Sequence, residues 1–348
     1  MSTTIGVGIL GLGRSGWGIH AAAISGHDGF EVVAVADPEP ERRAEAVAEF
    51  GCTAYPEPEG VIADDRVELV VVATPSQTHV PLALSALSGG RHVVVEKPMA
   101  QEVAGVDRMI AAADRAGRVL TCYQPRRLDP DFLAIRELVR SGRLGEPLLV
   151  RRTIHDFTRR RDWQTLRRFD GGMLSNTAPH LLDQVLQFAD PDTDFDLLAD
   201  LRHTVGAGDA EDHVLLVLRP KGAAGPLLQV EASSAVAIAQ PAWFVVGTAG
   251  TVSGSAPELT VRWSDPASWQ PLSLDEGPAP ERRYGSRETL CWDQEQVGGA
   301  GTGRSVALAF YDNLAAAVRE GAELLITAGS IRRQIGLLAR ARRQTGFR

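Results

Sequence analysis

The sequence is poor in cysteine and has no long hydrophobic run. Its three cysteines, Cys52, Cys122 and Cys291, are far apart, and no two of them form a CxxC pair. This spacing favours neither a zinc site nor a disulfide framework, so we expect no bound metal and reduced thiols in a cytoplasmic protein. No run of roughly 18 apolar residues occurs, so no transmembrane helix is expected. The first residues also lack the basic start and cleavable apolar run of a secretory signal.

An excess of basic residues is also missing. Acidic side chains outnumber lysine and arginine by 44 to 36, and the formal net charge is −8. Proteins that mainly bind nucleic acid or an anionic membrane need a basic surface, so we expect neither partner. Hydrophobic residues make up 44% of the chain and charged residues 23%, an ordinary globular composition. The length of 348 residues suits two domains.

The first third of the chain alternates short apolar runs with helical runs. Strands interleaved with helices at this spacing indicate βαβ units, a parallel sheet and right-handed crossovers. We therefore predict a doubly wound parallel sheet within residues 1–125. The expected strands are 4–10, 30–37, 67–75, 92–98 and 119–123, and the expected helices are 15–24, 39–51, 77–90 and 102–117.

The pattern changes after about residue 128. The later strands alternate apolar and polar residues, which is typical of antiparallel strands with one covered face. We predict an α/β domain over residues 126–348 with an open, mostly antiparallel sheet, and a surface excursion near the site at 265–304. The expected strands are 146–157, 212–220, 227–238 and 242–254, and the expected helices are 129–142, 305–321 and 330–344. The last two helices are expected to close the fold.

A glycine motif follows the first strand and opens the first helix. Gly11 would make the tight turn, Gly13 would let a pyrophosphate approach the backbone, and Gly16 would let the helix pack on the strand. Free N–H groups at the helix start favour an anion. Arg14 and Ser15 lie inside this loop and are further candidates for dinucleotide contact. A glycine-rich turn without a ligand is the alternative interpretation.

Asp37 ends the second strand, 21 residues after Gly16. A carboxylate at this place accepts hydrogen bonds from the adenosine ribose 2′-hydroxyl and repels a 2′-phosphate, which favours NAD over NADP. Arg42 and Arg43 follow in the helix and could still reach a phosphate. The alternative is that Asp37 serves only as a helix N-cap.

Glu96, Lys97 and Pro98 stand at the carboxyl end of a predicted parallel strand. Open α/β sheets bind ligands at that edge. A lysine ammonium there could stabilise a substrate oxygen during hydride transfer, and desolvation would lower its pKa into a range that suits proton transfer. The alternative is an ordinary solvated lysine.

The stretch GGMLSNTAPHLLDQ at 171–184 places a histidine at a helix start. Pro179 is tolerated only in the first helical turn, so His180 is expected close to the N-terminus. The helix dipole disfavours an imidazolium there, and a neutral histidine can act as general base or acid. Asp183 is expected to complement the dipole. A purely structural histidine is the alternative.

Several of these motifs together resemble the glucose–fructose oxidoreductase/inositol dehydrogenase/MocA (Gfo/Idh/MocA) oxidoreductase family. They are GLGRSG, ATPSQTH, EKP and the glycine run before His180, and the similarity spans nearly the whole chain. The resemblance implies a Rossmann domain, then an α/β domain whose open antiparallel sheet often forms the oligomer interface in relatives. A homo-oligomer, dimer or tetramer, is therefore expected. By the same resemblance, the cofactor and nicotinamide would be lined by Thr74, Pro75, His79, Glu96, Lys97 and Gln124.

The resemblance also assigns catalytic roles. Lys97 and His180 match the catalytic lysine and histidine of the family, whereas Asn176 stands where relatives usually have aspartate. An amide can orient a substrate hydroxyl but cannot take its proton, so proton transfer would rest on His180 and Lys97. The arginine-rich segment 151–170, with Trp163, is expected to form a substrate pocket wall that suits a carboxylated or phosphorylated substrate. A solvated basic loop is the alternative.

The predicted activity is an NAD(P)-dependent oxidoreductase. It would move a hydride between the nicotinamide and a secondary alcohol or ketone of a sugar, inositol or related polyol. Lys97 would polarise the oxygen, His180 would handle the proton, and Asn176 would orient the hydroxyl. The alternatives are a redox-assisted lyase or glycosidase that retains NAD, and a non-catalytic nucleotide-binding sensor.

Overall fold

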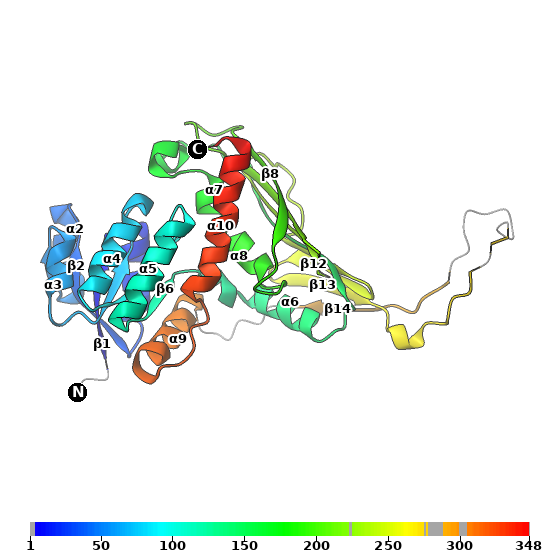
Figure 1. Cartoon of the computed structure of the whole chain (residues 1–348), viewed down its shortest axis with the longest axis horizontal. Helices are drawn as coiled ribbons and strands as arrows, with labels where there is room; N and C mark the ends of the chain where they lie inside the picture. Colours follow the sequence, from blue (N-terminus) through cyan, green and yellow to red (C-terminus); the bar gives the residue numbers. More distant parts are fainter. Residues whose placement is uncertain (1–3, 223–224, 275, 278–287, 299–304, 348) are drawn as a thin grey trace.

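The protein contains two β-sheets that follow one another along the chain. The computed structural model describes residues 4–222, 225–274, 276–277, 288–298 and 305–347. In Figure 1 the N-terminal sheet and its helices lie at one end of the molecule, and the second sheet lies beyond α8 and α10. No helix in these ranges is long and apolar enough to cross a membrane.

All strands of the first sheet run parallel, as predicted. Their spatial order is β3-β2-β1-β4-β5-β6, a doubly wound arrangement. Every residue of β1 and β4 is buried, which explains their continuous apolar sequence. The prediction lacks β3 and the helix α3 (Pro58–Ala63), because so short a strand has almost no periodicity. The strands are β1 (Ile5–Leu10), β2 (Phe30–Ala36), β3 (Thr53–Tyr55), β4 (Leu69–Val72), β5 (His92–Val95) and β6 (Leu120–Cys122).

The predicted helices of this half are present with small changes. The helix predicted at 15–24 begins as a π-helix rather than an α-helix. The next helix ends at Gly51, whose φ of 64° makes the left-handed cap that glycine provides without strain. The helices are η1 (Gly16–Ala21), α1 (Ala22–Ser25), α2 (Pro40–Phe50), α4 (His79–Ser88) and α5 (Val103–Ala116).

The second sheet is mostly antiparallel, as predicted, with strand order β14-β13-β12-β11-β7-β10-β9-β8. Within the described chain, β7 and β10 form its single parallel pair. Its strands are β7 (Pro147–His155), β8 (Phe195–Arg202), β9 (His213–Pro220), β10 (Leu227–Ser233), β11 (Trp243–Gly247), β12 (Gly250–Ser255), β13 (Glu258–Trp263) and β14 (Asp293–Val297).

Three features of this sheet differ from the prediction. The prediction of a single strand at 242–254 is wrong, because this segment forms a hairpin of β11 and β12. At Gly247 a side chain would lie 2.1 Å from the Leu144 carbonyl oxygen, so the chain turns there around a backbone contact that only glycine permits. Strands β8 and β13 fall where no strand is predicted. The predicted excursion at 265–304 contains β14, and residues 275, 278–287 and 299–304 lie outside the described residues.

Helices cover one face of the second sheet. Helix α8 (Ala178–Leu186) packs against β7 and β10, and α10 (Ala328–Thr345) packs against β8. Figure 1 shows these helices, with α6 (Pro130–Arg140), on the side of the sheet that faces the first sheet. None of the described helices covers the opposite face, so this sheet is open.

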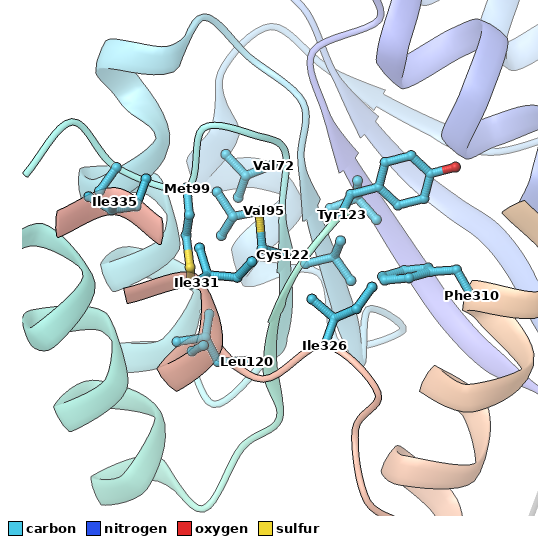
Figure 2. Close-up of a cluster of buried hydrophobic side chains, with 14 of the residues drawn as sticks. Val72, Val95, Met99, Leu120, Cys122, Tyr123, Phe310, Ile326, Ile331 and Ile335 are labelled. Carbon is cyan, nitrogen blue, oxygen red and sulfur yellow. The ribbon is translucent and has the colours of Figure 1, made fainter. Parts of the chain in front are cut away.

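The C-terminal segment joins the two halves. Helix α9 (Val306–Glu320) packs against α1, and α10 packs against α5, β6 and α8. Figure 2 shows Ile326 and Ile331 beside Leu120 and Cys122 of β6, so the end of the chain completes the core of the first sheet. The predicted domain boundary at 125/126 falls at the short turn η3 (Pro125–Leu128).

Candidate active site

The glycine loop between β1 and η1 has the geometry that a pyrophosphate needs. Gly11 has a φ of 89°, and an added Cβ would lie 2.8 Å from the Ala73 carbonyl oxygen. At Gly16 an added Cβ would lie 1.8 Å from the Gly11 oxygen, so helix and strand touch there. At Gly13 a Cβ would meet nothing within 4 Å. Bare backbone therefore faces open space at Gly13, and the loop fits a dinucleotide.

The predicted residues Arg14 and Ser15 lie in this loop. Arg14 is exposed, and Ser15 precedes η1 without capping it through its side chain. Both side chains therefore remain available to a phosphate, and their cofactor contact stays a prediction.

Asp37 is held rigidly at the end of β2. Its Oδ2 accepts a hydrogen bond of 2.7 Å from the Leu12 N–H, and its Oδ1 accepts one of 3.0 Å from the Glu39 N–H. The N-cap of α2 is Glu39, so the alternative of Asp37 as the N-cap is wrong. Arg42 lies 3.6 Å from Oδ2, and Arg43 donates to the Asp37 carbonyl. Both arginines therefore turn back toward the strand end.

His79 connects the loops that follow β4 and β5. Its Nδ1 lies 2.8 Å from the Pro98 carbonyl oxygen and its Nε2 lies 2.9 Å from that of Thr74. The ring faces protein carbonyls on both sides and is 1% exposed, which leaves no nitrogen for a cofactor. His79 thus holds Thr74 and Pro98 in place, whereas Pro75 is exposed beside them.

Lys97 reaches from the first sheet to the segment that carries Asn176. Its Nζ donates a 2.8 Å hydrogen bond to the Asn176 backbone carbonyl. Burial lowers the pKa of the ammonium, and the charges of Arg126 and Arg14 add to this effect, whereas Glu96 opposes it. Lys97 is therefore a desolvated cation of the kind that the sequence predicts.

A buried network supports Lys97 from behind. Glu96 Oε2 accepts the Lys97 N–H at 2.9 Å, and its Oε1 lies 3.2 Å from His20 Nε2. His20 Nδ1 lies 2.7 Å from the hydroxyl of Tyr311 in α9. Burial would raise the pKa of Glu96, but the hydrogen bond with His20 and the electrostatic interactions with His20 and Lys97 lower it overall. Glu96 is therefore an anion committed to protein partners.

His180 and Gln124 meet at the same place. His180 lies in the first turn of α8, where its Nδ1 is buried without a hydrogen-bond partner. Gln124 donates a 3.3 Å hydrogen bond to the Pro179 carbonyl, and its buried Oε1 is also unpartnered. Unsatisfied buried polar atoms on two residues joined in this way are uncommon, and they fit a site completed by a polar ligand. Burial lowers the pKa of His180 strongly, and the Lys97 and Arg126 charges add to this, so the ring is neutral.

Asp183 differs from its prediction. Its carboxylate forms a two-pronged ion pair with Arg127, with both N–O distances at 2.6 Å. Both side chains are buried. Asp183 therefore joins α8 to η3 as a structural ion pair and is not a dipole-complementing surface group.

A cleft opens where Asn176 ends the short helix α7 (Met173–Asn176). The basic segment 151–170 contributes Arg160, which is paired with Asp162 at 2.8 Å. Trp163 does not line the cleft but packs edge-on against Phe169 with half of its surface exposed. The cleft residues include Thr158, Arg160, Asn176, Thr177, Glu211 and Ser234.

Sequence patterns miss three residues that shape this site. His20 stands alone in an apolar helical run, a signal that could have marked it as functional. Tyr311 and Glu211 carry no local signal, because their partners are distant along the chain. Within the described residues, no cluster of three or more His, Cys, Asp or Glu side chains could hold a metal ion.

Both halves of the chain match models of one family of known proteins. Residues 5–124 match an oxidoreductase family with an NAD-binding Rossmann fold, and residues 132–253 match the GFO/IDH/MocA C-terminal domain. The uncharacterized oxidoreductase YdgJ of Escherichia coli K12 is 34% identical over 189 residues, which is 53% of this chain and 54% of YdgJ. Inositol 2-dehydrogenase of Rubrobacter xylanophilus is 39% identical over 153 residues, 43% of this chain and 44% of that enzyme. The chain thus aligns with about half the length of these curated relatives.

Solved structures extend the similarity to the full length. An NAD-binding protein from Listeria innocua superposes with a TM-score of 0.83 at 25% identity, covering 99% of this chain and 98% of that one. The glycine loop and the two matched domains agree with these relationships. The chain belongs to the Gfo/Idh/MocA family of oxidoreductases and carries that family's NAD-binding Rossmann domain.

Proposed function

We propose that the protein is an NAD-dependent dehydrogenase or reductase that acts on a secondary alcohol or ketone of a neutral polyol. The observation that carries this proposal is the convergence of three groups. The buried Lys97 ammonium lies against Asn176, beside the unpartnered His180 ring and the unpartnered Gln124 amide oxygen. All of them lie at the carboxyl edge of the Rossmann sheet or face it, where such sheets bind their ligands.

Relatives support inositols as the first substrates to test. Besides the Rubrobacter enzyme, the myo-inositol 2-dehydrogenase of Thermotoga maritima is 34% identical over 151 residues. The scyllo-inositol 2-dehydrogenase (NADP(+)) IolW of Bacillus subtilis is 32% identical over 187 residues. These names describe the relatives, and for this chain they support a polyol.

The charges around the cleft also favour a neutral substrate. Arg160 is paired with Asp162, Arg167 with Asp209, and Arg159 donates to a backbone carbonyl. The arginines of the basic segment are therefore largely engaged, and the cleft itself contains the carboxylate Glu211. Fewer arginine side chains are therefore left to bind an anionic substrate than the composition of residues 151–170 predicts.

In the proposed reaction the residues of the chain bind the substrate oxygen and move its proton. NAD, when bound, supplies the hydride acceptor or donor. The Lys97 ammonium hydrogen-bonds the reacting oxygen and stabilises its negative charge. The neutral His180 accepts the hydroxyl proton during oxidation and returns it during reduction. The Asn176 side chain orients a neighbouring hydroxyl.

NAD is the proposed cofactor rather than NADP. The Asp37 carboxylate is 3% exposed and fixed by two backbone N–H groups, so it cannot turn away from a 2′-phosphate. Arg42 lies 3.6 Å from the Asp37 Oδ2, and Arg43 donates a hydrogen bond to the Asp37 carbonyl. We expect NADH to bind at least tenfold more tightly than NADPH. A fluorescence titration with both cofactors tests this preference, and equal affinities would contradict it.

The activity is tested by following NADH absorbance with myo-inositol, scyllo-inositol and a panel of sugars, with Lys97→Met as the inactive control. Turnover by the wild type and its loss in the variant support the proposal. If NAD stays bound to the protein and the substrate is converted without net oxidation or reduction, the protein is instead a redox-assisted lyase or glycosidase. NADH binding without turnover on any polyol would indicate a sensor.

We further propose a homo-oligomer that forms through the open face of the second sheet. Its support is the absence of any described helix on that face. Light scattering on the purified protein tests it, and a monomer at micromolar concentration would contradict it. Cytoplasmic localisation stays a prediction based on the three unpaired cysteines.

A further inference from the structure

We propose that Glu211 supplies the substrate cleft with the carboxylate that position 176 lacks, and that it accepts a hydrogen bond from a polyol hydroxyl. This inference rests on the proposed function. Asn176 and Glu211 line the same cleft, although they are far apart in sequence. A neutral amide at 176 and a carboxylate at 211 thus line one cleft, and Asn176 is also the residue whose backbone carbonyl the Lys97 ammonium contacts.

The chain around Glu211 is built to place its carboxylate at α7. Its Oε1 accepts a 2.9 Å hydrogen bond from the Leu174 N–H, and its backbone oxygen accepts one of 2.9 Å from the Met173 N–H. Gly172 has a φ of 98°, and an added Cβ there would lie 2.2 Å from Oε1 and 2.6 Å from Oε2. The second glycine of the Gly-Gly run is thus needed to make room for this carboxylate.

The Glu211 carboxylate accepts hydrogen bonds from two backbone N–H groups, those of Leu174 and of Glu211 itself, and it has capacity for another donor. Its side chain is 5% exposed, and no side chain in the described ranges donates a hydrogen bond to it. An ionised carboxylate can accept about four hydrogen bonds, so about half of this capacity remains. A buried acceptor with spare capacity beside a polar cleft is suited to a substrate hydroxyl.

Several charged groups surround Glu211, and Arg160 of the same cleft is paired with Asp162. Burial is the largest effect on the pKa of Glu211 and raises it, whereas backbone hydrogen bonds and the charges of Arg342 of α10 and Arg167 of η5 (Arg167–Phe169) lower it. Asp212, directly before β9, accepts hydrogen bonds from the backbone N–H groups of residues 204–206. Asp170 lies with Arg342 in a second hollow behind α7, which Glu211 also borders.

A purely structural role is the competing explanation, since Glu211 caps α7. Glu211→Gln separates the two roles, because the glutamine oxygen can still accept the Leu174 N–H while the negative charge is lost. If capping is the only role, this variant should behave as the wild type. If the carboxylate binds substrate, the loss of a charge-assisted hydrogen bond should weaken polyol binding about tenfold or more.

The experiment measures binding of myo-inositol to the NADH-loaded protein by calorimetry between pH 5.5 and 8.5. For Glu211→Gln we expect at least tenfold weaker binding, an unchanged NADH affinity and a thermal midpoint close to that of the wild type. Wild-type affinity should fall toward low pH as Glu211 is protonated, and this dependence should disappear in the variant. Adding Asn176→Asp to Glu211→Gln should recover part of the affinity.

The matched control is Glu102→Gln, which makes the same change in the second hollow, where Glu102 pairs with Arg343. We expect no effect on myo-inositol binding. An equal loss of myo-inositol affinity in Glu211→Gln and Glu102→Gln would assign the effect to the second hollow and overturn the inference. Unchanged binding in Glu211→Gln would overturn it too, while leaving the proposed function intact. If the wild type binds no polyol at all, the proposed function fails and the inference fails with it.

Discussion

The ion pair between Arg127 and Asp183 gives the sharpest test of how the site is held together. Arg127 Nε and Nη2 each lie 2.6 Å from a carboxylate oxygen of Asp183. The same guanidinium donates to the Leu325 carbonyl at 3.0 Å and to the Ser330 hydroxyl at 2.8 Å. Arg127 and Asp183 are 7% and 2% exposed. One buried pair therefore joins η3, α8 and the start of α10.

Replacing one residue of this ion pair should lower the free energy of unfolding far more than replacing both. A single substitution leaves an uncompensated buried charge, which destabilises a protein by about 3–5 kcal/mol. Replacing both partners by apolar residues of similar size removes both desolvation penalties and is often close to neutral. We therefore expect Asp183→Leu and Arg127→Met each to lose about 3–5 kcal/mol. The double variant should lose clearly less than either single variant.

Urea unfolding, followed by tryptophan fluorescence, gives the free energy of unfolding of the wild type, the two single variants and the double variant. NADH affinity serves as a check that the first sheet is intact. The coupling energy should be several kcal/mol and opposite in sign to the single losses. Single losses below about 1 kcal/mol, or a double loss equal to their sum, would refute the assignment of a tightly coupled buried ion pair.

Four further outcomes are expected at and around the proposed reaction centre. Gly13→Ala should keep the thermal midpoint of the wild type but weaken NADH binding at least tenfold. In Gly16→Ala the new Cβ would lie 1.8 Å from a backbone oxygen, so this variant should unfold at a clearly lower temperature in differential scanning fluorimetry. Lys97→Met should lower kcat by about 10²–10⁴-fold with NADH binding retained. Because burial lowers the pKa of Lys97, wild-type reductase activity should decline toward high pH below the ordinary lysine value, and an unchanged profile up to that value would contradict this. Tyr311→Phe should cost about 1–3 kcal/mol in urea unfolding, because His20 loses its hydrogen-bond partner in a buried site.

The parts of the fold that sequence patterns predict are those specified by neighbours in the chain. Strands β1 and β4 are buried on both faces, so their apolar runs are continuous and easy to locate. Gly11 and Gly16 follow from the sharp turn and the close contact that they permit. Lys97 follows from the rule that ligands bind at the carboxyl edge of a parallel sheet.

The parts that escape prediction depend on contacts between distant segments. His20 and Tyr311 are 291 residues apart in sequence, and neither residue type signals the other. The role of Asp183 depends on Arg127, 56 residues away. The hairpin of β11 and β12 lies within an unbroken apolar and small-residue run, where periodicity cannot show a turn. Glu211 is similar, because only the folded chain places it over Gly172.

The position of His180 shows why these distant contacts matter for function. The carbonyl of Pro179, directly before it, accepts hydrogen bonds from Gln124 beside the first sheet and from Gln334 in α10. The Thr121 hydroxyl of β6 donates to the Ile326 carbonyl at 2.7 Å, which ties the same C-terminal segment to the strand that leads to Gln124. Lys97 belongs to the first sheet and His180 to the second domain, so their approach is set by this junction. The last helix of the chain therefore helps to set the position of His180, the proposed proton acceptor, relative to Lys97.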